Sequence, residues 1–382
     1  MRQQENWGIT TLKEVFNEAS DKVKARLGLF SYGTLGTFAG GVPAHVMEKD
    51  NEIILSVKDL KTYIYVNNRC NRAVDGVSFN VHKGKTLGIV GESGCGKSIT
   101  ASSIMQLLPK LSRIESGEIV YQKDDEAIRI DLLERNGKPM RDLRGADISM
   151  IFQDPMTALN PVYTIGSQIK ENLLYHTSMD KKSMTKKTIE MLEKMGIPLP
   201  HQRAEEYPHQ FSGGMRQRAM IAMAMSCNPK ILIADEPTTA LDVTIQAQIF
   251  ELMQKLKEEH QTAIILITHD MGVIAELADD VAVMYMGSIV EIGNVHEVLR
   301  KPAHPYTKAL LESIPILGKG KKQNIEPIRG ATPDPYQRPK GCQFLPRCDY
   351  ASNQCEQFPL DQQITNSHSV KCWKSNEVLS HV

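Results

Sequence analysis

A glycine-rich segment at residues 91–98, GESGCGKS, has the residue types and the spacing of a phosphate-binding loop. It follows an apolar, strand-like run at Thr86–Val90 and opens a helix-like run. Glycines let consecutive N–H groups curl around phosphate oxygens, while Lys97 can reach the β- and γ-phosphates and Ser98 can ligate Mg²⁺. A plain glycine turn needs no Lys-Ser pair at a helix start, so we predict a nucleoside triphosphate site. The predicted binding residues are Gly91, Glu92, Ser93, Gly94, Cys95, Gly96, Lys97, Ser98 and Ile99.

Two adjacent carboxylates, Asp235 and Glu236, end an apolar run at residues 231–234. If that run is a strand of a parallel sheet, both side chains emerge at the carboxyl edge, where open α/β sheets bind ligands. Asp235 would then face Mg²⁺, and Glu236 could polarise a water for in-line attack on the γ-phosphate. Adjacent carboxylates are also common on exposed turns, but the phosphate loop on another predicted strand favours the catalytic interpretation.

The elements that must position these residues lie between residue 52 and about residue 299, where apolar runs alternate with longer helical patterns. Several runs are apolar throughout, which is typical of strands covered on both faces in the parallel sheet of an α/β domain. No internal repeat of about 20–50 residues is visible. The predicted strands are residues 53–57, 86–90, 148–152, 230–234, 263–268 and 281–285.

The first fifty residues differ from this pattern. Residues 11–14, TLKE, have the form of a capping box, and apolar residues continue at helical spacing to Gly28, so one amphipathic helix is predicted. The glycine-rich stretch 33–43 then predicts a loop or linker. The polar face of the helix mixes both charges, so an ordinary surface helix explains it as well as docking on a partner or membrane.

Length and charge limit the number of domains and the kinds of partner that this chain can have. The chain has 382 residues, which predicts two or three domains, and its 45 Lys and Arg balance its 45 Asp and Glu. This balance removes any bulk electrostatic attraction to nucleic acid or to an anionic membrane. The first five residues lack the apolar core of a secretory signal, and no apolar run reaches about 18 residues. We therefore expect a soluble, cytoplasmic protein without a nucleic-acid partner.

Further segments join these signals into one ordered set. FSGGMRQR at residues 211–218 precedes the strand that carries the carboxylates, TALD at residues 239–242 follows it, and His269 comes after the next predicted strand. This order resembles the ATP-binding cassette of ABC transporters. The resemblance implies an α/β P-loop NTPase fold with a RecA-like core, an antiparallel β subdomain and a helical subdomain.

The resemblance also implies roles for single residues. Ser212, Gly213 and Gly214 form the signature loop, which clamps the γ-phosphate held by the phosphate loop of a second cassette, so hydrolysis requires a dimer. Gln153 matches the loop glutamine, which touches Mg²⁺ or the attacking water and moves with the permease. His269 matches the switch histidine that contacts the γ-phosphate.

The same comparison suggests roles for two further residues and shows one difference between this chain and the common family signature. Asp242 matches the dimer-interface aspartate, and Tyr63 is the expected aromatic partner of adenine, with Tyr65 as the competing choice. The common signature has leucine and glutamine where this chain has Phe211 and Met215. Because the serine and both glycines remain, we expect γ-phosphate contact to persist, while the departure bears on hydrolysis at the opposite site.

At a finer level the chain is similar to one of the two ATPases of oligopeptide and dipeptide importers. The similarity rests on residues 211–218, residues 234–246 and the segment 304–307, HPYT, and it covers about residues 53–373. It implies a heterodimer with a related ATPase, two permeases reached through residues 157–162, and an external peptide-binding protein. The expected location is the cytoplasmic face of the membrane, and the expected domains are 1–50, 51–300 and 301–382.

Four of the seven cysteines gather in the tail, in the pattern C-x5-C-x6-C-x16-C, with His368 four residues before the last. Reduced cytoplasmic thiols suggest a metal before a disulfide, but neither zinc nor ferredoxin spacings fit. Some relatives are held to carry a 4Fe–4S cluster; zinc and four packed, reduced thiols are the alternatives. The four residues are Cys342, Cys348, Cys355 and Cys372.

Three alternative functions stay open at this point. Importers of nickel or other solutes have similar ATPases, so the cargo does not follow from these residues. Soluble ABC ATPases of translation or DNA repair usually carry two cassettes in one chain or a long coiled-coil insertion, and this sequence has neither. A redox-sensing protein, in which the cysteine tail is the main feature, is the third.

Overall fold

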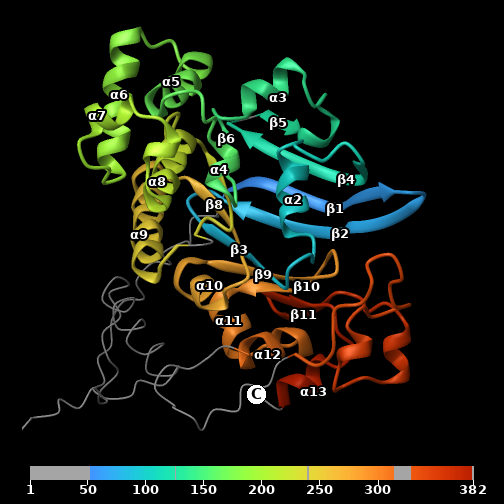
Figure 1. The fold of residues 1–382 in the computed structure, drawn as a ribbon. Helices are drawn as coiled ribbons and strands as arrows, with labels where there is room; N and C mark the ends of the chain where they lie inside the picture. The colour runs from blue at the N-terminus through green and yellow to red at the C-terminus, as the bar shows by residue number, and fades with distance from the viewer. Residues whose placement is uncertain (1–51, 125, 239–240, 314–327, 381–382) are drawn as a thin grey trace, which may run out of the picture. The chain divides into compact units, whose positions relative to one another are not determined.

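The computed structural model describes residues 52–124, 126–238, 241–313 and 328–380 (Figure 1). The chain divides into two compact units, Met1–Asp50 with Ala309–Ile328 and Asn51–Lys308 with Arg329–Val382, and the fold below is that of the second. The amphipathic helix predicted near residues 11–28 lies outside the described residues. None of the described helices has the length and apolar character needed to cross a membrane.

The predicted parallel sheet is present and organises the nucleotide-binding region. Its strands lie side by side in the order β9 (Asp280–Tyr285), β3 (Thr86–Val90), β8 (Ala263–Thr268), β7 (Ile231–Asp235) and β6 (Ile148–Ile151). Every residue of β3, β7 and β8 is buried, which is why these runs are apolar throughout rather than alternating. Because parallel strands end at the same edge, the segments that follow them are delivered to one place.

Three antiparallel strands, which the sequence did not reveal, extend this sheet beyond β9. They are β10 (Ser288–Asn294), β12 (His368–Val370) and β11 (Gln362–Thr365). The last two come from the cysteine-bearing tail, so the tail and the nucleotide-binding region share one continuous sheet.

The strand predicted at residues 53–57 belongs to a second sheet. It begins the longer strand β1, which pairs antiparallel with β2 and β4 and shows several register shifts. This confirms the expected antiparallel β subdomain, with the order β2 (Arg69–His82), β1 (Ile53–Val66), β4 (Ser112–Lys123) and β5 (Glu126–Arg129). An apolar run of five residues cannot tell parallel from antiparallel pairing, so periodicity alone missed this sheet.

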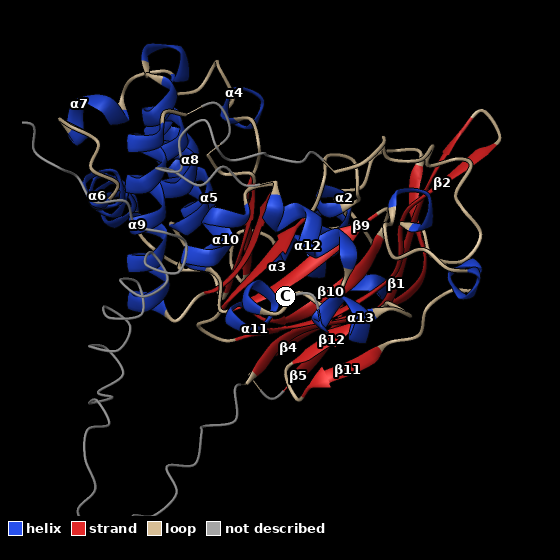
Figure 2. Ribbon diagram, turned by 90° about the horizontal axis from the view of Figure 1, so that it is seen from below, coloured by secondary structure: helices blue, strands red, loops and turns tan. Residues whose placement is uncertain are grey.

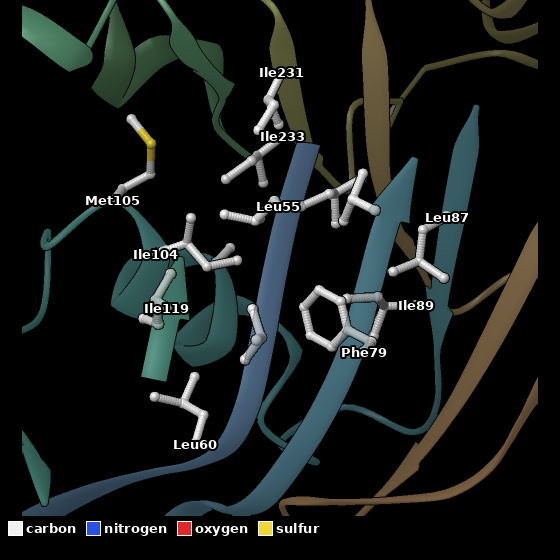
Figure 3. Close-up of a cluster of buried hydrophobic side chains, with 14 of the residues drawn as sticks. Leu55, Leu60, Phe79, Leu87, Ile89, Ile104, Met105, Ile119, Ile231 and Ile233 are labelled. Atoms are coloured by element: carbon white, nitrogen blue, oxygen red, sulfur yellow. The ribbon is translucent and has the colours of Figure 1, made fainter. Parts of the chain in front are cut away.

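The hydrophobic core lies between the two sheets and around helix α2 (Lys97–Ile104), which begins inside the phosphate loop. Figure 3 shows side chains from both sheets and from α2 meeting there. Burial of this helix against two sheets gives the phosphate loop a rigid support, because close-packed interiors resist local displacement. The labelled members of the core are Leu55, Leu60, Phe79, Leu87, Ile89, Ile104, Met105, Ile119, Ile231 and Ile233.

A helical subdomain, gathered on one side of the strands in Figure 2, separates β6 from β7 in the chain. Its helices pack on one another and are α5 (Ile165–His176), α6 (Lys181–Lys194), α7 (Pro200–Ala204) and α8 (Gly213–Met225). Side-chain caps set where they start: Thr164 accepts from the amide of Ser167, and Asp180 from that of Ser183. The remaining α-helices of the described residues are α3 (Lys138–Leu143), α4 (Pro155–Ala158), α9 (Val243–His260), α10 (Met271–Leu277), α11 (Val295–Arg300), α12 (Pro305–Glu312) and α13 (Ser375–Ser380).

Candidate nucleotide-binding and hydrolysis site

The phosphate loop connects β3 to α2, as the sequence predicted. Nζ of Lys97 donates hydrogen bonds to the carbonyl oxygens of Gly91 at 2.7 Å and Glu92 at 3.1 Å, and the side chain is buried. Gly96 has φ of +108°, and a Cβ there would lie 2.1 Å from the carbonyl oxygen of Ala73, so only glycine fits. The loop therefore presents backbone and a lysine at a helix N-terminus, the arrangement that binds phosphate.

The hydroxyl of Ser98 donates a 3.0 Å hydrogen bond to Oδ1 of Asp235, the last residue of β7. Burial is the main cause that raises the pKa of Asp235, the charge of Glu236 adds to it, and the bond from Ser98 opposes it. A hydroxyl beside a carboxylate at the end of a strand is the hard-oxygen environment that Mg²⁺ prefers. These two residues fit a magnesium site.

Glu236 stands between the two other predicted catalytic residues. Nε2 of Gln153 donates to its Oε2 at 3.0 Å, and Nδ1 of His269 lies 3.3 Å from its Oε1. The three residues follow β6, β7 and β8, which are neighbours in the parallel sheet. Glu236 has φ of +47°, in the left-handed region, and its amide donates to the carbonyl of Ile267 at 2.9 Å, which holds this uncommon conformation.

The signature segment begins helix α8. Oγ of Ser212 caps this helix by accepting from the amide of Met215 at 3.3 Å, and Ser212 and Gly213 are exposed. The side chain of Phe211 is only 3% exposed, so its departure from leucine changes core packing rather than the exposed loop. Gly214 packs closely, because a Cβ there would lie 3.1 Å from Cγ2 of Ile245.

Helix α8 is joined to the loop that follows β7 through Gln217 rather than through Ser212. The buried amide of Gln217 donates a hydrogen bond to the carbonyl oxygen of Pro237, directly after Glu236. Sequence analysis missed this residue, because a glutamine inside a helix carries no signal of a contact twenty residues away.

Asp242 caps helix α9. Its Oδ1 accepts from the amide of Ile245 at 3.0 Å, and the residue is exposed. Thr239 and Ala240, in the same predicted motif, lie outside the described residues. The carboxylate therefore has a local structural task besides any contact across a dimer interface.

Tyr63 and Tyr65 have different partners. The hydroxyl of Tyr63 donates to Oδ1 of Asp75 at 3.0 Å, and burial followed by this bond raises the pKa of Tyr63 to about 12. The amide of Asp75 donates to the carbonyl of Gly287, whose own amide donates to the carbonyl of Cys95 in the phosphate loop. Tyr65 instead bonds to Glu115. These links connect Tyr63 to the phosphate loop, and its role as the adenine partner stays a prediction.

The C-terminal tail reaches the phosphate loop through two residues that sequence analysis did not place there. The hydroxyl of Tyr306 accepts from the amide of Glu92 at 2.9 Å, and the guanidinium of Arg347 donates to both carboxylate oxygens of Glu92. The HPYT segment marked Tyr306 only by resemblance. In the sequence, Arg347 was distinguished only by its position between two of the tail cysteines, Cys342 and Cys348.

The four tail cysteines line one pocket, together with His304, Phe344 and neighbouring residues. His368 is not among them: its Nε2 lies 2.7 Å from Oε1 of Glu291, and both residues are buried. Burial raises the pKa of the Cys348 thiol to about 11 and that of the Cys372 thiol to about 12. In the part of the chain that the structure describes, no three His, Cys, Asp or Glu side chains converge as ligands of a single metal ion.

Comparison with protein families gives two matches along this chain. The model for ABC transporters matches residues 74–239, and the model for the C-terminal region of oligopeptide/dipeptide transporters matches residues 290–355. The first therefore spans the phosphate loop and the two carboxylates, and the second spans Tyr306, Arg347 and three of the tail cysteines.

Characterised sequences and solved structures resemble the chain as well. The dipeptide transport ATP-binding protein DppD of Bacillus subtilis is 50% identical over 332 residues, covering 86% of this chain and 97% of the relative. The oligopeptide transport ATP-binding protein OppD of the same organism is 48% identical over 322 residues, covering 84% and 88%. Among structures, the dimeric post-hydrolysis state of the cassette MJ0796 bound to ADP and Pi has a TM-score of 0.56 and 26% identity, covering 63% of this chain and 98% of that one.

Proposed function

The chain belongs to the ABC transporter family of dipeptide and oligopeptide transport ATP-binding proteins and is the ATP-hydrolysing subunit of a peptide importer; we propose the following roles for its residues. The observation that carries the proposal is convergence at one sheet edge, where Ser98 bonds to Asp235 and where Gln153 and His269 flank Glu236. The names of the relatives favour peptides over nickel or another solute, and favour transport over a soluble, non-transport ATPase.

The phosphate loop would bind the triphosphate through its amides, and Lys97 would exchange its two carbonyl partners for the β- and γ-phosphates. Ser98 and Asp235 would hold Mg²⁺, which when bound neutralises charge that develops on the phosphates. Glu236 would accept the proton of the attacking water. Gln153 and His269 would keep its carboxylate turned toward that water, because each already contacts one of its oxygens.

The signature residues would act on a second cassette. Ser212 and Gly213 are exposed at the N-terminus of α8, a helix of 13 residues, so their amides and the helix dipole are accessible to a phosphate on another subunit. We propose a heterodimer with a related ATPase, in which Gly214 completes the same loop and Asp242 lies at the interface. Closure around ATP and opening after hydrolysis would then drive transport.

The permease would dock beside Gln153. The segment that follows this residue exposes three large apolar side chains, Met156 at 57%, Val162 at 70% and Tyr163 at 57%. Exposed apolar groups gathered next to a catalytic loop are typical of an interaction surface. Two permease subunits would place this chain peripherally at the cytoplasmic face of the membrane, and an external binding protein would select the peptide.

The tail cysteines are proposed as ligands of a 4Fe–4S cluster. Cys342, Cys348, Cys355 and Cys372 line one pocket, and a cluster of this type is held by four cysteine thiolates. We assign this role to a proposed C-terminal domain, residues 301–382, which follows a proposed ATP-binding domain, residues 51–300. Anaerobic purification should yield iron and sulfide in the intact chain and in Cys70→Ser, which changes an exposed cysteine, but not in Cys372→Ser. Intact chain free of iron and sulfide would show that the thiols are structural, and would also remove the redox-sensing alternative.

The transport function is tested by producing the chain with its cognate ATPase, permeases and binding protein. The complex should co-purify, retain labelled adenine nucleotide, release inorganic phosphate and take up labelled dipeptides or oligopeptides into vesicles. A complex that neither retains nucleotide nor releases phosphate would refute the proposal. Phosphate release stimulated by Ni²⁺ complexes but not by peptides would restrict it to another cargo.

A further inference from the structure

The phosphate loop contains a carboxylate, Glu92, at its second position. A negative charge beside a triphosphate repels it, since like charges a few ångströms apart in a partly desolvated site interact strongly. The Glu92 side chain is only 28% exposed, so water screens it incompletely. This loop therefore needs a neutralising partner for Glu92 before it receives nucleotide.

The C-terminal tail supplies that partner. Nη1 of Arg347 donates to Oε2 of Glu92 at 2.7 Å, and Nη2 donates to Oε1 at 3.0 Å. This two-pronged pair fixes the direction of the carboxylate as well as its charge. Thr332, also from the tail, donates to Oε2 of Glu92 at 3.3 Å.

Arg347 is itself held in place. Its side chain is 4% exposed, its Nε donates to the carbonyl of Arg329 at 2.9 Å, and its guanidinium lies 5.8 Å from the ring centroids of Tyr285 and Phe344. A buried cation with fixed neighbours loses little freedom on pairing and is costly to leave alone. The ion pair is therefore a built contact rather than a chance meeting of mobile surface groups.

The same loop residue is held through its backbone. The amide of Glu92 donates to the hydroxyl of Tyr306 at 2.9 Å, and the ring of Tyr306 packs against those of Tyr285 and Phe344. The carbonyl of Glu92 accepts from Nζ of Lys97 at 3.1 Å. A continuous set of contacts thus leads from Arg347 through Glu92 to the lysine that would bind the phosphates.

We propose that Arg347 is a positioning residue of the nucleotide site: it neutralises Glu92 and holds the phosphate loop in the shape that receives ATP. This inference rests on the proposed function and adds to it a part played by the C-terminal tail. Arg347 ends the short helix Leu345–Arg347, directly before Cys348, so the segment that carries the cysteines also completes the ATP site.

The test measures binding of a fluorescent ATP analogue and the KM and kcat of phosphate release, with the chain in its complex. Arg347→Gln leaves Glu92 charged and without its cationic partner, so it should weaken nucleotide binding and raise the KM about tenfold or more, with a smaller change in kcat. Adding Glu92→Gln to Arg347→Gln removes the repelling charge and should restore most of the affinity. Arg329→Gln is the matched control, because that side chain forms an exposed pair with Asp349 at 3.6 Å and should bind nucleotide normally.

Each outcome separates the alternatives. Wild-type nucleotide affinity in Arg347→Gln would overturn the inference while leaving the transport function intact. A double variant that binds nucleotide more weakly than Arg347→Gln alone would also overturn it, because the losses of affinity from two independent structural defects add. If Arg347→Gln fails to fold, Arg347→Lys and Arg347→Met replace it, because lysine keeps the charge that neutralises Glu92 and methionine does not; equal affinities of these two variants would refute the role. Failure of the unchanged complex to bind the analogue would instead refute the proposed function.

Discussion

The hydroxyl of Ser98 donates to the carboxylate of Asp235 at 3.0 Å, although 137 residues separate the two in the chain. The bond joins the first turn of α2 to the last residue of β7. It sets two magnesium-type ligands side by side at the sheet edge where Gln153, Glu236 and His269 also meet. The chemistry of the protein is thus assembled by strand order, since these residues come from the ends of four strands that are neighbours in the sheet, β3, β8, β7 and β6.

Replacing Glu236 by glutamine should separate binding from hydrolysis. The amide keeps the shape of the side chain but cannot accept the proton of water, so turnover should fall about 10²- to 10⁴-fold. Nucleotide affinity should stay near the wild-type value, and the closed dimer should accumulate with ATP. Phosphate release, nucleotide titration and size-exclusion chromatography measure the three quantities. Glu251→Gln, on the exposed face of α9, serves as the control, and normal turnover in Glu236→Gln would remove this residue from the mechanism.

Lys97→Ala should instead weaken nucleotide binding. The ammonium group is the positive charge within the phosphate loop, and a charge-assisted bond to phosphate contributes about 1.5–3 kcal/mol, equivalent to roughly a tenfold to hundredfold change in Kd. Titration with labelled ATP measures the change, and Lys58→Ala, an exposed lysine on β1, should leave it unaltered. Equal affinities of Lys97→Ala and the unchanged protein would contradict the assignment of the loop.

Two substitutions of Asp242 can separate its role as a helix cap from its proposed role at the dimer interface. Asp242→Ala removes the acceptor for the amide of Ile245 and should lower the free energy of unfolding by about 0.5–2 kcal/mol. Asp242→Asn keeps an acceptor, so its stability should stay close to wild type while any effect of lost charge on dimer formation remains. Urea unfolding and sedimentation give the two measurements. Equal loss of stability in both variants would argue against the cap.

The buried imidazole of His304 should make the protein sensitive to acid. Burial lowers its pKa from 6.5 to about 3, so below pH 6.5 the unfolded chain binds a proton that the folded chain does not bind. Stability is full above pH 6.5 and is lost as the pH falls toward 3, with a slope of up to about 1.4 kcal/mol per pH unit. His304→Asn can still accept from the amide of Tyr306 and should flatten this slope. His296→Asn, at an exposed position, should not, and an unchanged slope in His304→Asn would assign the acid sensitivity to other groups.

Gln217 offers a test of the link between α8 and the catalytic loop. Gln217→Ala leaves the carbonyl of Pro237 without this buried donor and should cost about 1–3 kcal/mol in the free energy of unfolding. Gln248→Ala removes a glutamine whose bond to Arg218 is exposed, and it should cost less. Denaturant titration compares the two variants. Similar small losses in both would show that the Gln217 bond contributes little.

Sequence analysis worked best where the relevant contacts are local. The phosphate loop, the strand before it and the helix after it are contiguous, so composition and spacing sufficed to predict all three. The same holds for β7 and the carboxylates at its end. Five of the six predicted strands are neighbours in the parallel sheet, because burial on both faces leaves an uninterrupted apolar run.

The remaining structure depends on contacts between distant segments. The antiparallel sheet around β1, the tail strands β11 and β12, and the pocket shared by the four cysteines come from pairings that leave no periodic trace in one chain. Roles for Gln153 and His269 were suggested by resemblance, and only the fold shows that both contact Glu236.

The order of amino acids alone encodes the reactive groups: a phosphate loop and a pair of carboxylates, each within a few consecutive residues, and four tail thiols within residues 342–372. The folded arrangement determines which of these groups meet. Arg347 neutralises Glu92 across 255 residues because the tail strands join the edge of the same sheet and carry that arginine back to the phosphate loop. Such a contact is specified by packing and strand order, which are properties of the whole fold and not of any local segment.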